Sequence, residues 1–186
     1  MRKTSDYLRL KIDGYKYLFY IVASEYWYKT RNQYIQALEE TFSHHIGTEC
    51  IVISSYPEES EKNFDAILSI KNWPHDIEKV LTRDSGLHLL IISKNLQEFN
   101  PDMDKFVLVD FSGDAILPGR FFKALEDIQA AINKKKDLFD WFDERAEKEN
   151  SLTKRIYDAS DIQINVYFYS FSIKKFLKWE GSSIHS

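Results

Sequence analysis

The stretch from Pro118 to Asn150 constrains the fold most, because it holds the longest periodic pattern in the chain. Its apolar residues recur at spacings of three and four, which places them along one side of an α-helix. These residues are Phe121, Leu125, Ile128, Ile132, Phe139, Phe142 and Ala146, and only Lys135 interrupts them. A helix over this stretch, with Pro118 as its first residue, would be about 45 Å long. We therefore expect one long helix with more apolar surface than its own domain covers.

The composition favours a single folded domain in the cytoplasm. The chain has 186 residues, of which 44% are hydrophobic and 15% aromatic, and such values argue against disorder. The net charge of −4 argues against nucleic acid and anionic membranes as partners. The only cysteine, Cys50, excludes an intrachain disulfide and fits a reducing compartment as a small core residue. No apolar run approaches the roughly 20 residues that span a bilayer, so we expect a soluble protein.

The N-terminal region predicts an antiparallel hairpin. Residues 7–12 alternate between apolar and polar side chains, which is the period of a half-buried strand. The pair Asp13-Gly14 is favoured in two-residue turns between antiparallel strands. Residues 15–23 would then form the returning strand.

Further along the chain, helical and strand patterns alternate. A helix is expected after Asn32, with Gly47 just past its end, and a second is expected to open at residues 73–76. Short apolar runs without alternation are typical of strands covered on both faces. Such runs cover residues 50–54, 64–70, 87–93 and 106–111.

These patterns together predict an α/β fold with a layered, mostly parallel sheet and the N-terminal hairpin at one edge. A ferredoxin-like α+β arrangement is the alternative. We expect residues 1–117 to form the sheet core, with the long helix of residues 118–150 packed on it. Residues 151–186 would complete the same domain with a strand over 162–168 and a short helix over 173–177.

One candidate ligand site follows from the strand ends. In open α/β sheets, ligands bind beyond the carboxyl ends of the strands. The predicted strand ends include Ser54-Ser55 and the segment from Asp110 to Asp114. Asp110, Ser112 and Asp114, followed by Arg120 near the start of a helix, form a set that suits Mg²⁺ or a polar ligand. The competing interpretation is an ordinary turn, since Asp and Gly dominate turns.

Common catalytic motifs are absent from the sequence. No P-loop, dinucleotide-binding glycine pattern or serine nucleophile elbow occurs. The five histidines lack the spacing of a metal site. The sequence therefore assigns no catalytic or metal-ligating residue, and no cofactor apart from Mg²⁺ under the strand-end hypothesis.

Two groups of side chains suggest a binding surface instead. The first is Tyr26, Trp27 and Tyr28, beside Lys29 and Arg31. Aromatic residues next to cations can stack on bases or anchor a protein partner, although they also pack in cores. The second group lies on the long helix, where apolar residues spread over a wide arc. Its members are Leu138, Phe139, Trp141 and Phe142.

Three functions are compatible with these features. The first is a non-enzymatic protein-interaction module, a subunit of a cytoplasmic homo- or hetero-oligomer. The second is a metal-dependent enzyme or sensor that acts on a nucleotide or another phosphate-bearing ligand at the strand ends. The third is a single-stranded nucleic-acid binder that uses residues 26–31. Surplus apolar surface and the missing motifs favour the first.

Overall fold

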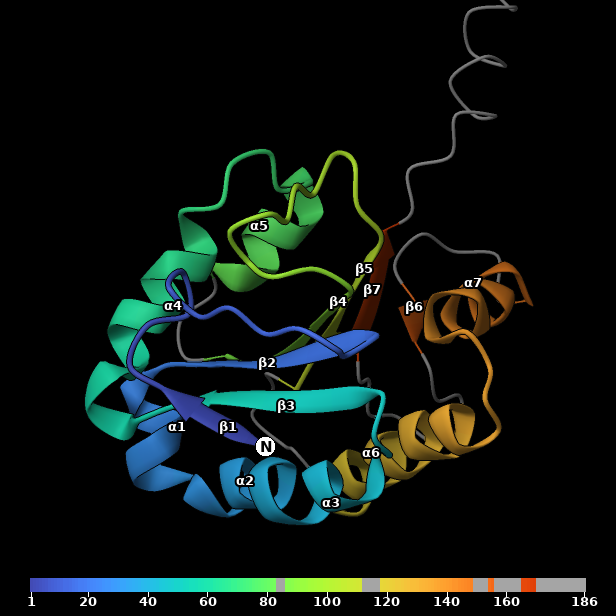
Figure 1. Cartoon of the computed structure of the whole chain (residues 1–186), viewed down its shortest axis with the longest axis horizontal. Helices are drawn as coiled ribbons and strands as arrows, with labels where there is room; N and C mark the ends of the chain where they lie inside the picture. The colour runs from blue at the N-terminus through green and yellow to red at the C-terminus, as the bar shows by residue number, and fades with distance from the viewer. Residues whose placement is uncertain (83–85, 112–117, 149–153, 156–164, 170–186) are drawn as a thin grey trace, which may run out of the picture.

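The computed structural model describes residues 1–82, 86–111, 118–148, 154–155 and 165–169 (Figure 1). Helices lie on both faces of one mixed sheet, so the fold is α/β. The sheet has seven strands in the order β1-β3-β2-β4-β5-β7-β6. The strands are β1 (Arg2–Thr4), β2 (Tyr17–Ala23), β3 (Cys50–Ser55), β4 (Leu87–Ile92), β5 (Phe106–Asp110), β6 (Lys154–Arg155) and β7 (Asn165–Tyr169).

The helices connect these strands across the two faces of the sheet. They are α1 (Glu25–Thr30), α2 (Asn32–Gln36), the π-helical turn η1 (Ala37–Phe42), α3 (Ser43–His45), the 3₁₀ turn η2 (Pro57–Glu59), α4 (Ser60–Leu68), α5 (His75–Leu81), α6 (Pro118–Asn133) and α7 (Leu138–Lys148). In Figure 1, α4 and α5 lie on one side of the sheet, and α2, α3 and α6 lie on the other.

The strand directions correct the expectation of a mostly parallel centre. β1 and β2 both pair with β3 in parallel. The remaining pairings, β2 with β4, β4 with β5, β5 with β7 and β7 with β6, are antiparallel. β4 begins at the same edge of the sheet at which β3 ends, so β4 runs in the direction opposite to β3. The strand order gives no support to the ferredoxin-like alternative.

The predicted N-terminal hairpin is wrong in its first strand. Residues 7–12 form turns, whereas β2 forms as expected and pairs with β3 and β4. The apolar residues alternate with polar ones because Tyr7, Leu10 and Ile12 of this loop are buried. Side chains hold this loop in place of a strand partner, since the backbone N–H of Ile12 donates to Oδ1 of Asn95 at 2.8 Å.

Residues 64–70, predicted as a strand, belong to helix α4 and the turn after it. Ile67 is fully buried, and Phe64 and Leu68 pack partly buried against the same cluster. Their spacing of three and four residues is helical, and a short apolar run does not distinguish the two states. The other predicted central strands are confirmed as β3, β4 and β5.

The predicted long helix is also wrong, because it is divided into α6 and α7. Lys135 adopts a left-handed backbone conformation with φ of 55° between them. Asp137 then caps α7, since its Oδ1 accepts the N–H groups of Phe139 and Asp140 at 3.1 and 3.2 Å. The chain folds back at this point, so both helices cover the same sheet rather than extending past it.

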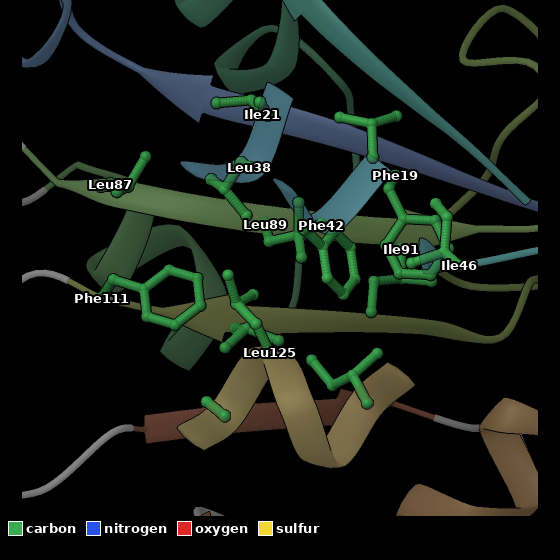
Figure 2. Packing of buried hydrophobic residues seen from close by; sticks show 14 of the residues in the cluster. Phe19, Ile21, Leu38, Phe42, Ile46, Leu87, Leu89, Ile91, Phe111 and Leu125 are labelled. Atoms are coloured by element: carbon green, nitrogen blue, oxygen red, sulfur yellow. The ribbon is translucent and has the colours of Figure 1, made fainter. Parts of the chain in front are cut away.

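The two faces of the sheet form two apolar clusters. The larger cluster lies between the sheet and helices α1–α3, α6 and α7. Figure 2 shows Phe19 and Ile21 from β2, Leu89 and Ile91 from β4, and Leu125 from α6 converging there. The second cluster joins the opposite face to α4, α5 and the loop of residues 7–12. Cys50 is buried as expected.

The C-terminal region is described in part. β7 lies beside β5 and overlaps the strand predicted over 162–168 at residues 165–168. Residues 162–164 and the predicted helix over 173–177 lie outside the described residues.

Candidate functional site

The carboxyl ends of β1, β3, β2 and β5 lie at one edge of the sheet, because these strands run in the same direction. The chain leaves β2 through α1 toward one face and leaves β3 through α4 toward the other. Ligand sites in open α/β sheets lie at such a change of direction between neighbouring parallel strands. The ends of β2 and β3 are therefore the first place to look for a site.

A directed chain of hydrogen bonds lies at this point. The backbone N–H of Ser55 donates to the hydroxyl oxygen of Tyr28 at 3.2 Å. That hydroxyl lies 3.1 Å from Oγ of Ser54, and Ser54 Oγ–H in turn donates to Oε1 of Glu39 at 2.5 Å. Because Ser54 gives its only proton to Glu39, Tyr28 is the donor in its bond with Ser54. Nζ of Lys3 completes the chain, 2.9 Å from Oε2 of Glu39.

A second arm extends to the other face of the sheet. Nδ2 of Asn63 donates to Oγ of Ser55 at 2.7 Å, and Oδ1 of Asn63 accepts the backbone N–H of Tyr7 at 2.7 Å. The hydroxyl of Tyr7 donates to the carbonyl oxygen of Ile21 in β2 at 2.6 Å. We call the seven residues the strand-end network. They are Lys3, Tyr7, Tyr28, Glu39, Ser54, Ser55 and Asn63.

The π-helical turn η1 places Glu39 in the network. Glu39 is buried among the apolar residues of this turn, although carboxylates are rarely buried without a partner. Side chains also bond to carbonyl groups of the turn: Ser43 Oγ to that of Glu39, and Nδ1 of His44 and His45 to those of Glu40 and Thr41. Single π-helical turns occur often at functional sites.

Burial keeps the two tyrosines of the network protonated. Burial raises the pKa of Tyr28 and outweighs the effect of its hydrogen bonds with Ser54 and Ser55. Burial also raises the pKa of Tyr7 well above its usual value, and the neighbouring Tyr28 and Tyr20 add to this effect. Both hydroxyls therefore act as donors. Ser54 is completely buried, so its hydroxyl is closed to solvent.

A second polar pair lies at the same edge. His88 in β4 and Asp110 in β5 are direct partners across the strands, with Nδ1 3.1 Å from Oδ1. Both side chains are fully enclosed. Within the described residues Nε2 of His88 makes no hydrogen bond, and it lies against Gly86, where an added Cβ would be 2.1 Å away.

Exposed apolar side chains follow the strand ends that carry the strand-end network. Leu8, Tyr26 and Tyr56 follow the carboxyl ends of the adjacent strands β1, β2 and β3, and their exposed fractions are 39%, 48% and 44%. Polar contacts tie the three segments together. Nζ of Lys62 lies 3.2 Å from Oδ2 of Asp6, and the backbone N–H of Glu25 donates to Oε1 of Glu61 at 3.0 Å. We call Leu8, Tyr26 and Tyr56 the strand-end surface.

The structure describes only part of the ligand site that the sequence suggested. Asp110 is buried against His88, Ser112 and Asp114 lie outside the described residues, and the side chain of Arg120 in α6 is likewise outside the description. The four residues therefore do not form a described ligand site.

The expected interaction surface is largely core. Trp27 and Tyr28 are buried in the larger cluster, and only Tyr26 of that group is exposed. Leu138, Phe139 and Phe142 are buried by the same chain, and Trp141 packs partly buried against them. This corrects the expectation of an uncovered apolar face on residues 118–150, because the break at Lys135 turns that face onto the sheet.

Sequence reasoning missed Glu39 and Lys3, because nothing in their neighbourhoods predicts that they meet. They are 36 residues apart by their positions in the chain, and a π-helical turn carries one of them. Ser54-Ser55 did carry a signal, as a predicted strand end.

No family model, curated protein or solved structure matches this chain. Among the described residues, no helix is both long and apolar enough to cross a membrane. Within the same residues, no group of three or more His, Cys, Asp or Glu side chains could hold a metal ion.

Proposed function

We propose that the protein is an interaction module that docks on a partner protein through the strand-end surface. The single observation that carries this proposal is the exposure of Leu8, Tyr26 and Tyr56 above three adjacent strand ends. Exposed tyrosines are frequent energetic centres of protein interfaces, because they combine a large apolar ring with a hydroxyl group. This replaces the α7 face as the docking surface.

The strand-end network supports this role because its hydrogen bonds fix the backbone that carries the strand-end surface. Tyr28 belongs to the same short helix as Tyr26, and its hydroxyl is held by both Ser54 and Ser55. Ser55 directly precedes Tyr56 and donates its hydroxyl proton to the Tyr56 carbonyl oxygen at 2.9 Å. Side chains presented from a backbone fixed in this way lose little conformational entropy on binding.

The experiment compares matched tyrosine variants for complex formation in the native host. Tyr26→Ser combined with Tyr56→Ser should abolish cross-linking to the partner and leave stability within about 0.5 kcal/mol of the wild type. Tyr15→Ser is the control, since Tyr15 is similarly exposed at 39% but lies before β2, at the opposite edge. Light scattering would report a second copy of the chain as the partner. Equal cross-linking by all three proteins would refute the proposal.

A second candidate is a sensor or enzyme for a nucleotide or another phosphate-bearing ligand. The departure of the chain from β2 and from β3 toward opposite faces of the sheet favours it, and its ligand would bind at the ends of these two strands rather than at Asp110. A thermal-shift measurement with nucleotides, with and without Mg²⁺, tests it. A flat response for the wild type would remove this candidate.

The cations near Tyr26 do not support the nucleic-acid hypothesis. Lys29 pairs with Glu25 at 2.6 Å, and the guanidinium of Arg31 lies over the Trp27 ring, 5.7 Å from its centroid. Both cations already have intramolecular partners, so we do not pursue this function further.

A further inference from the structure

We propose that Glu39, with Ser54 and Tyr28, forms a binding site for an alkylammonium group, and that Lys3 fills this site from within the same chain. Glu39 has two carboxylate oxygens with separate tasks. Oε1 accepts the buried Ser54 hydroxyl, and Oε2 faces the Lys3 ammonium at 2.9 Å. The site is distinct from the strand-end surface, and the inference does not depend on the proposed function.

The fold holds the Glu39 side chain more firmly than the Lys3 side chain. The Glu39 side chain is 6% exposed and sits in a helix that packs into the larger apolar cluster. Lys3 is 34% exposed and belongs to β1, a strand of three residues at the edge of the sheet. Short terminal edge strands open more readily than core elements. When β1 opens, the carboxylate loses its cation, while Ser54, itself bonded to the Tyr28 hydroxyl, still donates to its other oxygen.

The chemistry of the site requires an ammonium ion that carries an N–H donor. A buried carboxylate is costly without a positive partner, so a cation that takes the place of Lys3 stabilises the open form. The ammonium must also donate a hydrogen bond to Oε2, and a quaternary ammonium ion has no N–H group with which to donate one. A free alkylamine or the lysine side chain of another chain supplies the same group.

The test uses the full chain with Lys3→Ala, which removes the side chain beyond Cβ. The missing fragment corresponds to n-propylammonium, so this ion is the probe. We expect Lys3→Ala to have a lower Tm than the wild type, and n-propylammonium chloride to raise it in a saturable way at millimolar concentrations, as suits one ion pair. Tetramethylammonium chloride at equal ionic strength should give no saturable rise. N-acetyl-lysine methylamide in the same assay distinguishes a lysine side chain from a free amine.

The double variant Lys3→Ala with Glu39→Gln separates a specific site from a general salt effect. It should show no saturable response to n-propylammonium. The proposal is overturned if the double variant responds as strongly as Lys3→Ala, or if Lys3→Ala does not respond.

A second measurement covers the case in which Lys3→Ala does not fold. In the wild type, n-propylammonium competes with Lys3, so the backbone amides of β1 should exchange with solvent faster in its presence than in tetramethylammonium. Equal exchange in the two salts counts against the site.

Discussion

The strand-end network and the His88–Asp110 pair lie at the same edge of the sheet, yet they are built differently. In the network, the donors point in one direction from Ser55 through Tyr28 and Ser54 to Glu39, and the carboxylate then meets Lys3, whose side chain is 34% exposed. The His88 and Asp110 side chains, by contrast, are both enclosed. Because Lys3 reaches the surface, we expect the buried Glu39 carboxylate to be able to exchange its cation. We expect the enclosed His88–Asp110 pair to have a structural role.

The largest effect is expected from His88→Leu. This change removes the imidazole that lies beside the buried Asp110 carboxylate and should lower the free energy of unfolding by about 3 kcal/mol. Urea unfolding followed by tryptophan fluorescence measures it. Replacing both residues with leucine should recover part of the loss. A loss below about 1 kcal/mol would show that the pair contributes no more than a surface ion pair.

The next effect tests how closely His88 is packed. Gly86→Ala places a Cβ 2.1 Å from Nε2 of His88 and should cost about 1–3 kcal/mol through overpacking. The cost should largely disappear in a His88→Ala background, which removes the clash. Gly119→Ala is the matched control, because nothing lies within 4 Å of its added Cβ. If Gly86→Ala costs the same in both backgrounds, the two residues are not coupled.

A smaller effect is expected at the open end of the network. Lys3→Met should cost only about 1 kcal/mol, because Lys3 is a third exposed and water can reach Glu39 in its place. Urea unfolding at low and high salt measures this change. A loss as large as that of His88→Leu would mean that both clusters are equally closed, and the contrast between them would fail.

The smallest effect comes from the opposite edge of the sheet, where Asp137 joins the start of β2. Burial alone would raise the pKa of Asp137, but hydrogen bonds from Lys16 and Tyr17 outweigh it and lower the pKa. Its stabilisation is therefore present above the pKa of the unfolded chain and is lost as pH falls through the lower pKa of the folded state. Asp137→Asn keeps an N-cap but removes the ion pair with Lys16, and it should cost about 0.5–1 kcal/mol at neutral pH. Unfolding measured across the acidic range should show the two proteins converging, and a constant difference would contradict the assignment.

Parts of the fold were predictable because they depend on local patterns. The continuous apolar runs in β3, β4 and β5 were recognised as inner strands and are buried along their whole lengths. Gly47 ends the helical segment with φ of 75°, as its position predicts. Residues 64–70 failed because a short apolar run suits a helix and a strand alike.

The site was less predictable, because it depends on residues from distant segments. Tyr28, Glu39 and Ser54 meet only after α1 and η1 pack over the larger cluster beside β3. The predicted apolar surface on residues 118–150 failed for a related reason. A helical period shows which side chains share a face, but it does not show whether the chain breaks at Lys135 and turns that face inward.

By itself, the sequence determined the alternation of apolar strands and amphipathic helices, because burial imposes a period that can be read locally. Only the tertiary structure decided the strand order, the break between α6 and α7, and the meeting of Lys3 with Glu39. Those outcomes depend on contacts between residues far apart in the chain, and such contacts leave no spacing in the sequence to read.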